Sequence, residues 1–92
     1  MHRKPELLNR VAQWLELELD KTCVPMGMYM SIEIKLEGKR LSFTKKHRGR
    51  SEDIGSLYLD DTKQVTGMVI AGDVTATITL MLFALEKAIE TF

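Results

Sequence analysis

The feature that most constrains the fold is a strict alternation of apolar and polar residues from Met28 to Glu37. A period of two places alternate side chains on opposite faces of an extended chain, so this segment predicts a strand with one buried face. Gly38-Lys39 then forms a two-residue turn with glycine first, as a type II′ hairpin prefers, and Arg40 to Lys45 runs back as a second strand.

This hairpin has a self-consistent register. A two-residue loop places opposite charges together on one face and apolar pairs together on the other. The predicted pairs are Glu37 with Arg40 outside, and Leu36 with Leu41 and Ile34 with Phe43 inside.

A helix is predicted before the hairpin, from Pro5 to Lys21. Apolar residues recur there at spacings of three and four, namely Leu8, Val11, Leu15 and Leu19. The alternation within residues 15–19 also fits a strand, but length and helix propensity favour the helix, and Pro25 ends any extension of it.

After the hairpin, residues 46–53 show no periodicity and predict a loop. A strand at Ile54–Leu59, a turn at residues 60–63 and a strand at Gln64–Ala71 follow, with Gly67 marking a bulge. Asp73 is suited to cap a final helix over 74–91, although the β-branched residues of 74–79 also fit a strand.

These elements predict a single α+β domain over residues 1–92. Its order is α-β-β-β-β-α: a four-stranded antiparallel meander with the N- and C-terminal helices packed on one apolar face. In order the elements resemble those of the double-stranded RNA-binding domain, but that family's lysine-rich motif opens its last helix, where this chain has Gly72-Asp73-Val74-Thr75. Small α+β domains of this size are also frequent among phage-encoded accessory proteins and host-defence inhibitors.

Composition narrows the setting of this domain. The 92 residues are 45% hydrophobic and 28% charged with a formal net charge of zero, as in ordinary globular proteins. A single cysteine, Cys23, forms no intrachain disulfide, which favours the cytoplasm, and the most apolar window, Ile78–Leu85, is too short for a membrane span. We therefore expect a cytoplasmic protein without a membrane partner.

Catalytic patterns are sparse, and we expect neither an enzyme nor a cofactor. Cys23 is predicted to be a half-buried apolar residue rather than a nucleophile, because only Lys21 lies near it in sequence to lower its pKa. A metal-assisted hydrolase would require Asp60, Asp61 and Asp73 to converge, and solvated turn residues are the simpler interpretation.

Charge is unevenly distributed along the sequence. Residues 35–50 contain seven Lys or Arg and one Glu, a net charge of +6, whereas residues 51–92 contain two Lys and seven Asp or Glu, a net charge of −5. Arginine forks and lysine charges around a flexible glycine suit an anion, so nucleic acid, a nucleotide or an acidic protein surface is the expected partner. The candidate ligand-binding residues are Arg40, Lys45, Lys46, His47, Arg48 and Arg50, with Tyr29 and Tyr58 on the outer sheet face to stack bases.

The final helix predicts a second contact surface. Ala76, Leu80 and Phe83 form an apolar strip beside Lys87, away from the core-facing stripe. A homodimer would cover this strip in so small a domain. The alternative to the anion-binding module is therefore an interaction or inhibitor protein that docks a larger partner through this helix and the charged rim.

Overall fold

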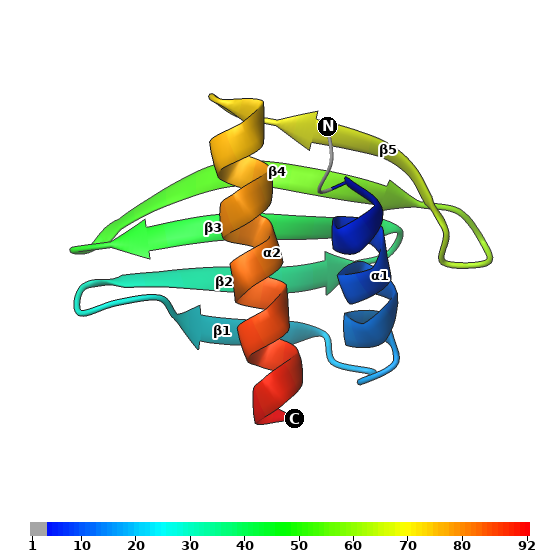
Figure 1. The fold of residues 1–92 in the computed structure, drawn as a ribbon, viewed down its shortest axis with the longest axis horizontal. Helices are drawn as coiled ribbons and strands as arrows, with labels where there is room; N and C mark the ends of the chain where they lie inside the picture. The colour runs from blue at the N-terminus through cyan, green and yellow to red at the C-terminus, as the bar shows by residue number, and fades with distance from the viewer. Residues whose placement is uncertain (1–3) are drawn as a thin grey trace.

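The structure is a computed structural model that describes residues 4–92. Two helices lie side by side across one face of an antiparallel sheet whose strand order follows the sequence, β1-β2-β3-β4-β5 (Figure 1). The elements are α1 (Lys4–Leu15), β1 (Lys21–Pro25), β2 (Met30–Glu37), β3 (Arg40–His47), β4 (Arg50–Leu59), β5 (Val65–Ile70) and α2 (Val74–Thr91). The predicted α+β meander with both helices on one face is confirmed, but its sheet has five strands rather than four.

The additional strand is β1, where no strand was predicted and where the predicted helix Pro5–Lys21 reaches only the first residue. The helix ends at Leu15, and Glu18 takes a left-handed φ of 56° where the chain reverses. β1 then pairs with β2 and buries alternate side chains, Thr22 and Val24. The five residues of β1, which begin with a lysine and end with a proline, form too short a pattern to predict a strand. Their conformation depends on pairing with β2.

The buried stripe of α1 is rotated from the predicted one. Leu7, Val11, Trp14 and Leu15 are buried, whereas Leu8 is 38% exposed. Val11 and Leu15 of the predicted stripe are buried, but the helix ends at Leu15, so the predicted continuation of the stripe to Leu19 is wrong.

The β2–β3 hairpin is confirmed in register, with Glu37 opposite Arg40 and Ile34 opposite Phe43. A type II′ turn has a positive φ at its first central residue only. The hairpin fits this type, because Gly38 has a φ of 60° and the φ of Lys39 is not positive. The strand begins at Met30 rather than earlier, so Met28 lies in the loop after β1 and is 86% exposed.

Residues 46–53 are not a loop. β3 and β4 continue to a two-residue turn at Arg48-Gly49. A bulge at Ile54 explains why no period was visible, because Thr44 pairs with Asp53 while Phe43 pairs with Gly55, so the alternation changes phase within β4.

The last strand and helix agree with their predicted positions. β5 shifts register beside Gly67, since Tyr58 pairs with Gly67 but Leu59 pairs with Val65, and the predicted bulge is confirmed. Asp73 caps α2 by accepting a 2.7 Å hydrogen bond from the Ala76 backbone N–H, so residues 74–79 are helical.

The core lies between the sheet and the two helices. α2 contributes Ile78, Met81, Leu82, Ala84, Leu85 and Ala88. Val74 and Phe92 are 44% and 67% exposed at the two ends of the helix. Within residues 4–92 no helix has the length and hydropathy of a membrane span.

Candidate functional site

The basic run of the sequence forms the tip of the β3–β4 hairpin. We define the basic tip as Lys45, Lys46, His47, Arg48 and Arg50, which close around Gly49. The turn residues Arg48 and Gly49 have φ values of 50° and 81°, so both are left-handed, as in a type I′ turn. Glycine adopts this conformation freely, whereas an L-residue such as arginine is disfavoured there and Asn or Asp is the usual choice.

Arg48 lies against an aromatic ring from a different loop. Its guanidinium carbon is 4.8 Å from the centroid of the Tyr29 ring, within the range of a cation–π contact. Tyr29 directly precedes β2 and is 59% exposed, so the stacked pair faces solvent. Two neighbouring turns of the sheet, residues 26–29 and 48–49, therefore present an arginine and a tyrosine together.

The two lysines of the basic tip are paired with carboxylates. Lys46 Nζ is 3.0 Å from Glu33 Oε2, and Lys45 Nζ is 3.9 Å from Glu52 Oε2. The hydrogen bond from Lys46 lowers the pKa of Glu33, and the same bond raises the pKa of Lys46. Among residues 4–92, neither Arg48 nor Arg50 has a carboxylate partner, so the uncompensated charge of the basic tip rests on these two arginines.

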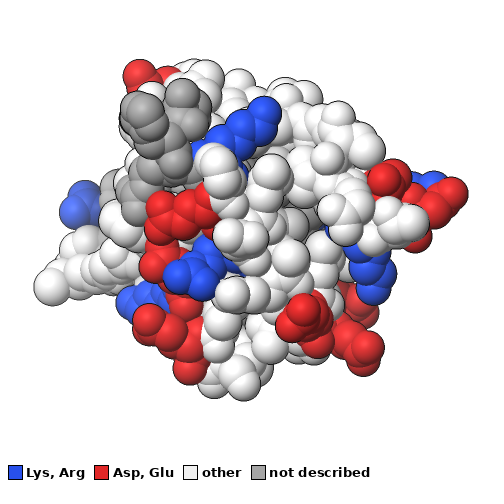
Figure 2. Space-filling model, turned by 45° about the vertical axis from the view of Figure 1, so that its right-hand side comes forward, with Lys and Arg blue, Asp and Glu red and all other residues white. Residues whose placement is uncertain are grey.

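The charge imbalance along the sequence is largely cancelled in space. Antiparallel pairing sets the basic strand β3 beside the acidic first half of β4, with Lys45 opposite Glu52 in register. Three more pairs lie away from the tip: Arg40 with Asp53 at 3.3 Å, Lys35 with Glu37 at 3.6 Å, and Lys39 with Asp61. In Figure 2, blue and red side chains are interspersed on the visible face rather than separated into two regions.

Two predicted site residues lie far from the tip. Arg40 and Tyr58 are opposite each other on β3 and β4, and Arg40 precedes the turn by a strand length of about 25 Å at roughly 3.3 Å per residue. The Arg40 side chain donates to Ser56 Oγ at 3.1 Å and to Asp53 Oδ2 at 3.3 Å, beside a hollow of about 120 Å³ on the sheet face without helices. The eight predicted ligand residues therefore form two separate groups.

The other sequence-based candidates are also separated. Asp60 and Asp61 lie in the turn before β5, and Asp73 lies after this strand, so the three carboxylates do not converge; the part of the chain from Lys4 onward holds no cluster of potential metal ligands. Cys23 is exposed on β1 rather than half-buried, with its Sγ 3.8 Å from Ser31 Oγ.

The predicted strip on α2 is only partly on the surface. Ala76 and Lys87 are exposed and Phe83 is 48% exposed, but Leu80 is half-buried and packs against the core. α2 packs against α1 as well as against the sheet, so a larger part of its surface is buried than the sheet alone would cover (Figure 1).

The stacked pair Tyr29–Arg48 was not predicted from sequence, although a signal for it existed. In the predicted β2–β3 register, each step back along β2 from Glu37 is matched by one step forward along β3 from Arg40. Continued one step beyond Met30 and His47, this register places Tyr29 opposite Arg48. Because residues 46–53 were predicted as a loop, the register was not extended that far.

Comparison with known proteins supplies no relative: no family model, no curated protein and no solved structure matches this chain.

Proposed function

We propose that this protein is a non-enzymatic module that binds an anionic ligand, nucleic acid or a nucleotide, at the β3–β4 hairpin tip. The main support for this proposal is the conformation of Arg48, which occupies a left-handed turn position with its guanidinium stacked on the exposed Tyr29 ring. Residues held in a disfavoured conformation cluster at functional sites, because the local strain has to be offset by some other requirement. The need to present the Arg48 guanidinium to a ligand would be such a requirement.

The chemistry of the tip favours a ligand with both phosphates and bases. Arg48 and Arg50 carry positive charge without a carboxylate partner in the described chain, and arginine pairs bidentately with phosphate oxygens. Tyr29 is exposed and offers an aromatic surface on which a base can stack. Single-stranded nucleic acid combines both features along one short segment, so it is the first ligand to test.

The test uses fluorescence anisotropy with a short fluorescein-labelled oligothymidine. The double variant Arg48→Ala with Arg50→Ala should weaken binding roughly 100-fold, because two charge-assisted contacts of about 1.5 kcal/mol each are lost. The slope of log affinity against log salt should become shallower by about 1.4, since each phosphate contact on a single strand contributes about 0.7.

The matched control is Lys35→Ala with Lys39→Ala, which removes the same charge at the other end of the sheet. This variant should retain most of the affinity and the salt slope of the wild type. Equal losses in both double variants would mean that net charge alone drives binding, and retained binding by the arginine variant would remove the proposal.

The second candidate is an interaction or inhibitor protein that uses α2, favoured by the 48% exposure of the large Phe83 side chain. Because Leu80 packs against the core, a Leu80 variant would confuse unfolding with lost binding. Phe83→Ser with Lys87→Glu is the sharper probe, and it should abolish capture of a partner protein without lowering the melting temperature. Unchanged capture by this variant would exclude α2 as the docking helix.

A further inference from the structure

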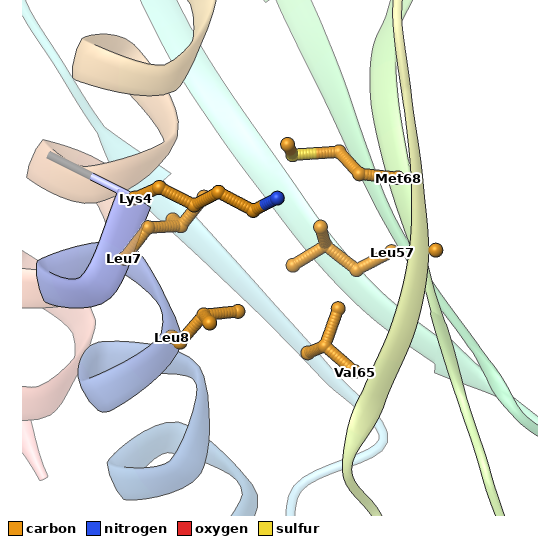
Figure 3. A pocket seen from close by; sticks show the side chains of 7 residues that line it. Lys4, Leu7, Leu8, Leu57, Val65 and Met68 are labelled. Carbon is orange, nitrogen blue, oxygen red and sulfur yellow. The ribbon is translucent and has the colours of Figure 1, made fainter. Parts of the chain in front are cut away.

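An apolar groove separates the first turns of α1 from the inner face of β4 and β5. It has a volume of about 210 Å³. Its lining residues within 4–92 are Lys4, Leu7, Leu8, Leu57, Val65, Gly67 and Met68. In Figure 3 the two leucines of α1 face Leu57, Val65 and Met68 across the groove. The only polar side chain among these residues is that of Lys4, so the walls themselves are apolar.

The exposure of Leu8 shows that α1 does not close onto the sheet at this point. The residues of α1 that point to the core are buried, whereas Leu8 is 38% exposed on the side of the helix that faces Val65. Val65 and Met68 pack against the core but are only partly buried. Protein interiors contain few voids larger than a water molecule, so an uncovered space of this size beside the core can accept a ligand.

The volume of the groove limits the length of such a ligand. At ~30 Å³ for each small group, the share of liquid volume that one water molecule takes, the groove holds about seven carbon atoms. Pockets for drug-sized ligands have volumes of roughly 300–1,000 Å³, so this groove suits a smaller molecule. Aliphatic walls and the flexible thioether of Met68 adapt to an unbranched alkyl chain.

Lys4 places a positive charge at the mouth of the groove. Its side chain extends over the apolar walls in Figure 3, and within residues 4–92 it has no carboxylate partner. Lys4 is also the first residue of α1, so the positive end of the helix dipole lies at the same mouth. Glu6 is in the first turn as well, but it does not line the groove. An uncompensated cation beside an apolar groove complements an alkyl chain with an anionic head group.

We propose that this groove binds a medium-chain fatty acid of about eight carbons, the length that its volume admits. The alkyl chain lies between α1 and β5, and the carboxylate contacts Lys4 Nζ. Octanoate matches this size, because all of its carbons except the carboxylate carbon belong to the chain. The groove is separate from the β3–β4 hairpin tip, so this second ligand does not depend on the proposed anion binding there.

The first experiment measures how affinity depends on chain length. Butanoate, hexanoate, octanoate and decanoate are titrated into the wild type by isothermal calorimetry, below the concentrations at which they form micelles. Affinity should rise about fourfold for each added methylene up to octanoate, because each one is buried in the groove. It should then level off, since further carbons stay in water. A series without this break, or no binding of octanoate at millimolar concentration, would overturn the proposal.

The second experiment tests the role of Lys4 by comparing octanoate with 1-octanol, which has a chain of similar length and no charge. The wild type should bind octanoate about fivefold more tightly, the effect of one exposed ion pair. Lys4→Met keeps the aliphatic stem and should remove this preference. Lys45→Met is the matched control, because it removes a lysine at the hairpin tip and should leave the preference intact. Equal affinity of the wild type for both molecules would show that Lys4 only covers the groove.

The third experiment locates the ligand. In protein labelled with ¹³C at the methionine methyl groups, octanoate should shift the NMR signal of Met68, which lines the groove, and leave that of Met28, which lies in the loop before β2, unchanged. Leu8→Trp fills part of the groove and should weaken octanoate binding at least about tenfold, since it displaces two or more methylenes. Shifts at Met28 without a shift at Met68, or wild-type affinity in a folded Leu8→Trp protein, would place the ligand elsewhere and refute the proposed site.

Discussion

Trp14 is fully buried near the end of α1, and its indole Nε1–H donates a 3.1 Å hydrogen bond to Thr22 Oγ1 on β1. Thr22 is itself buried, so neither group can turn to water instead. This single bond joins the first helix to the strand that follows it. It also explains why a bulky residue with a polar N–H is accommodated in an otherwise apolar core.

Thr22→Val should therefore lower the free energy of unfolding by about 1–3 kcal/mol, because valine has the same shape but leaves the indole N–H unpaired. Urea denaturation followed by Trp14 fluorescence measures the loss. Thr22→Ser keeps the hydroxyl and should lose less. A Thr22→Val protein as stable as the wild type would show that the indole finds another acceptor.

Asp60 organises the turn before β5. Its Oδ1 accepts hydrogen bonds from the Thr62 hydroxyl at 2.7 Å, the Gln64 backbone N–H at 2.9 Å and the Thr62 backbone N–H at 2.8 Å. These bonds, first that from the Thr62 side chain and then that from Gln64, hold the pKa of Asp60 below its ordinary value. Because they favour the charged carboxylate, the turn depends on its ionisation.

This lowered pKa gives a pH dependence of known sign. Asp60 stabilises the fold fully above its unfolded pKa of about 3.9, and this contribution is lost as the pH falls through the lower folded value. Thermal melts of the wild type and Asp60→Asn from neutral to acid pH should converge at the acid end. A carboxyl carbon titration of Asp60 by NMR that gives an ordinary pKa would contradict this account.

At the scale of elements, the β3–β4 and β2–β3 hairpins differ in whether the residues at the positive-φ positions of their turns favour that conformation. The β2–β3 turn places glycine at its left-handed position, Gly38 with a φ of 60°. The β3–β4 turn needs two left-handed residues and has Arg48 at the first. The bulge at Ile54 adds a second irregularity, and the strands are closely packed beside it at Gly55, where a Cβ would lie 3.0 Å from Val69 O. This hairpin is therefore the one that departs from simple turn chemistry.

Arg48→Asn should separate stability from binding in this hairpin. Asparagine tolerates the left-handed conformation, and we expect the free energy of unfolding to stay unchanged or to rise by up to about 1 kcal/mol, with the lost cation–π contact offsetting part of the gain. Affinity for labelled oligothymidine should fall. Urea denaturation and anisotropy on the same protein measure both effects, and a clear loss of stability would show that Arg48 serves the fold instead.

At the scale of the whole molecule, ion pairs span the sheet from the tip to the opposite end. Each of the pairs named above among residues 4–92 has at least one side chain that is about half exposed or more, from Lys46 with Glu33 to Lys39 with Asp61. Surface pairs of this kind contribute about 0–1 kcal/mol each and are screened by salt. The charges therefore shape recognition more than they stabilise the fold.

Raising the salt concentration should accordingly separate the two properties. Between low salt and roughly 0.5 M NaCl, we expect the free energy of unfolding to change by less than about 1 kcal/mol, because the apolar core carries the stability. Oligothymidine binding should be lost over the same range. A protein that unfolds much more easily at high salt would show that the cross-strand pairs hold the sheet together.

Local patterns were sufficient where one element decided its own conformation. The β2–β3 register and the start of α2 at Asp73 were predicted because alternation, turn chemistry and helix capping act over a few residues. β1 was missed because its conformation depends on β2, and the tip was predicted as a loop because the bulge at Ile54 breaks the period. The eight ligand residues were predicted as one set, although the length of β3 separates Arg40 from Arg48.

By itself, the sequence determined that this chain folds as a meander with two helices on one face, since the order of periods and turns allows few other arrangements. Only the tertiary structure decided which charges remain available, because antiparallel pairing brings carboxylates of β2 and β4 against the basic side chains of β3, and the net charge counted along the sequence does not show these pairs. It also decided where the open edge lies, since an edge is defined by the absence of a neighbour and not by anything within β5.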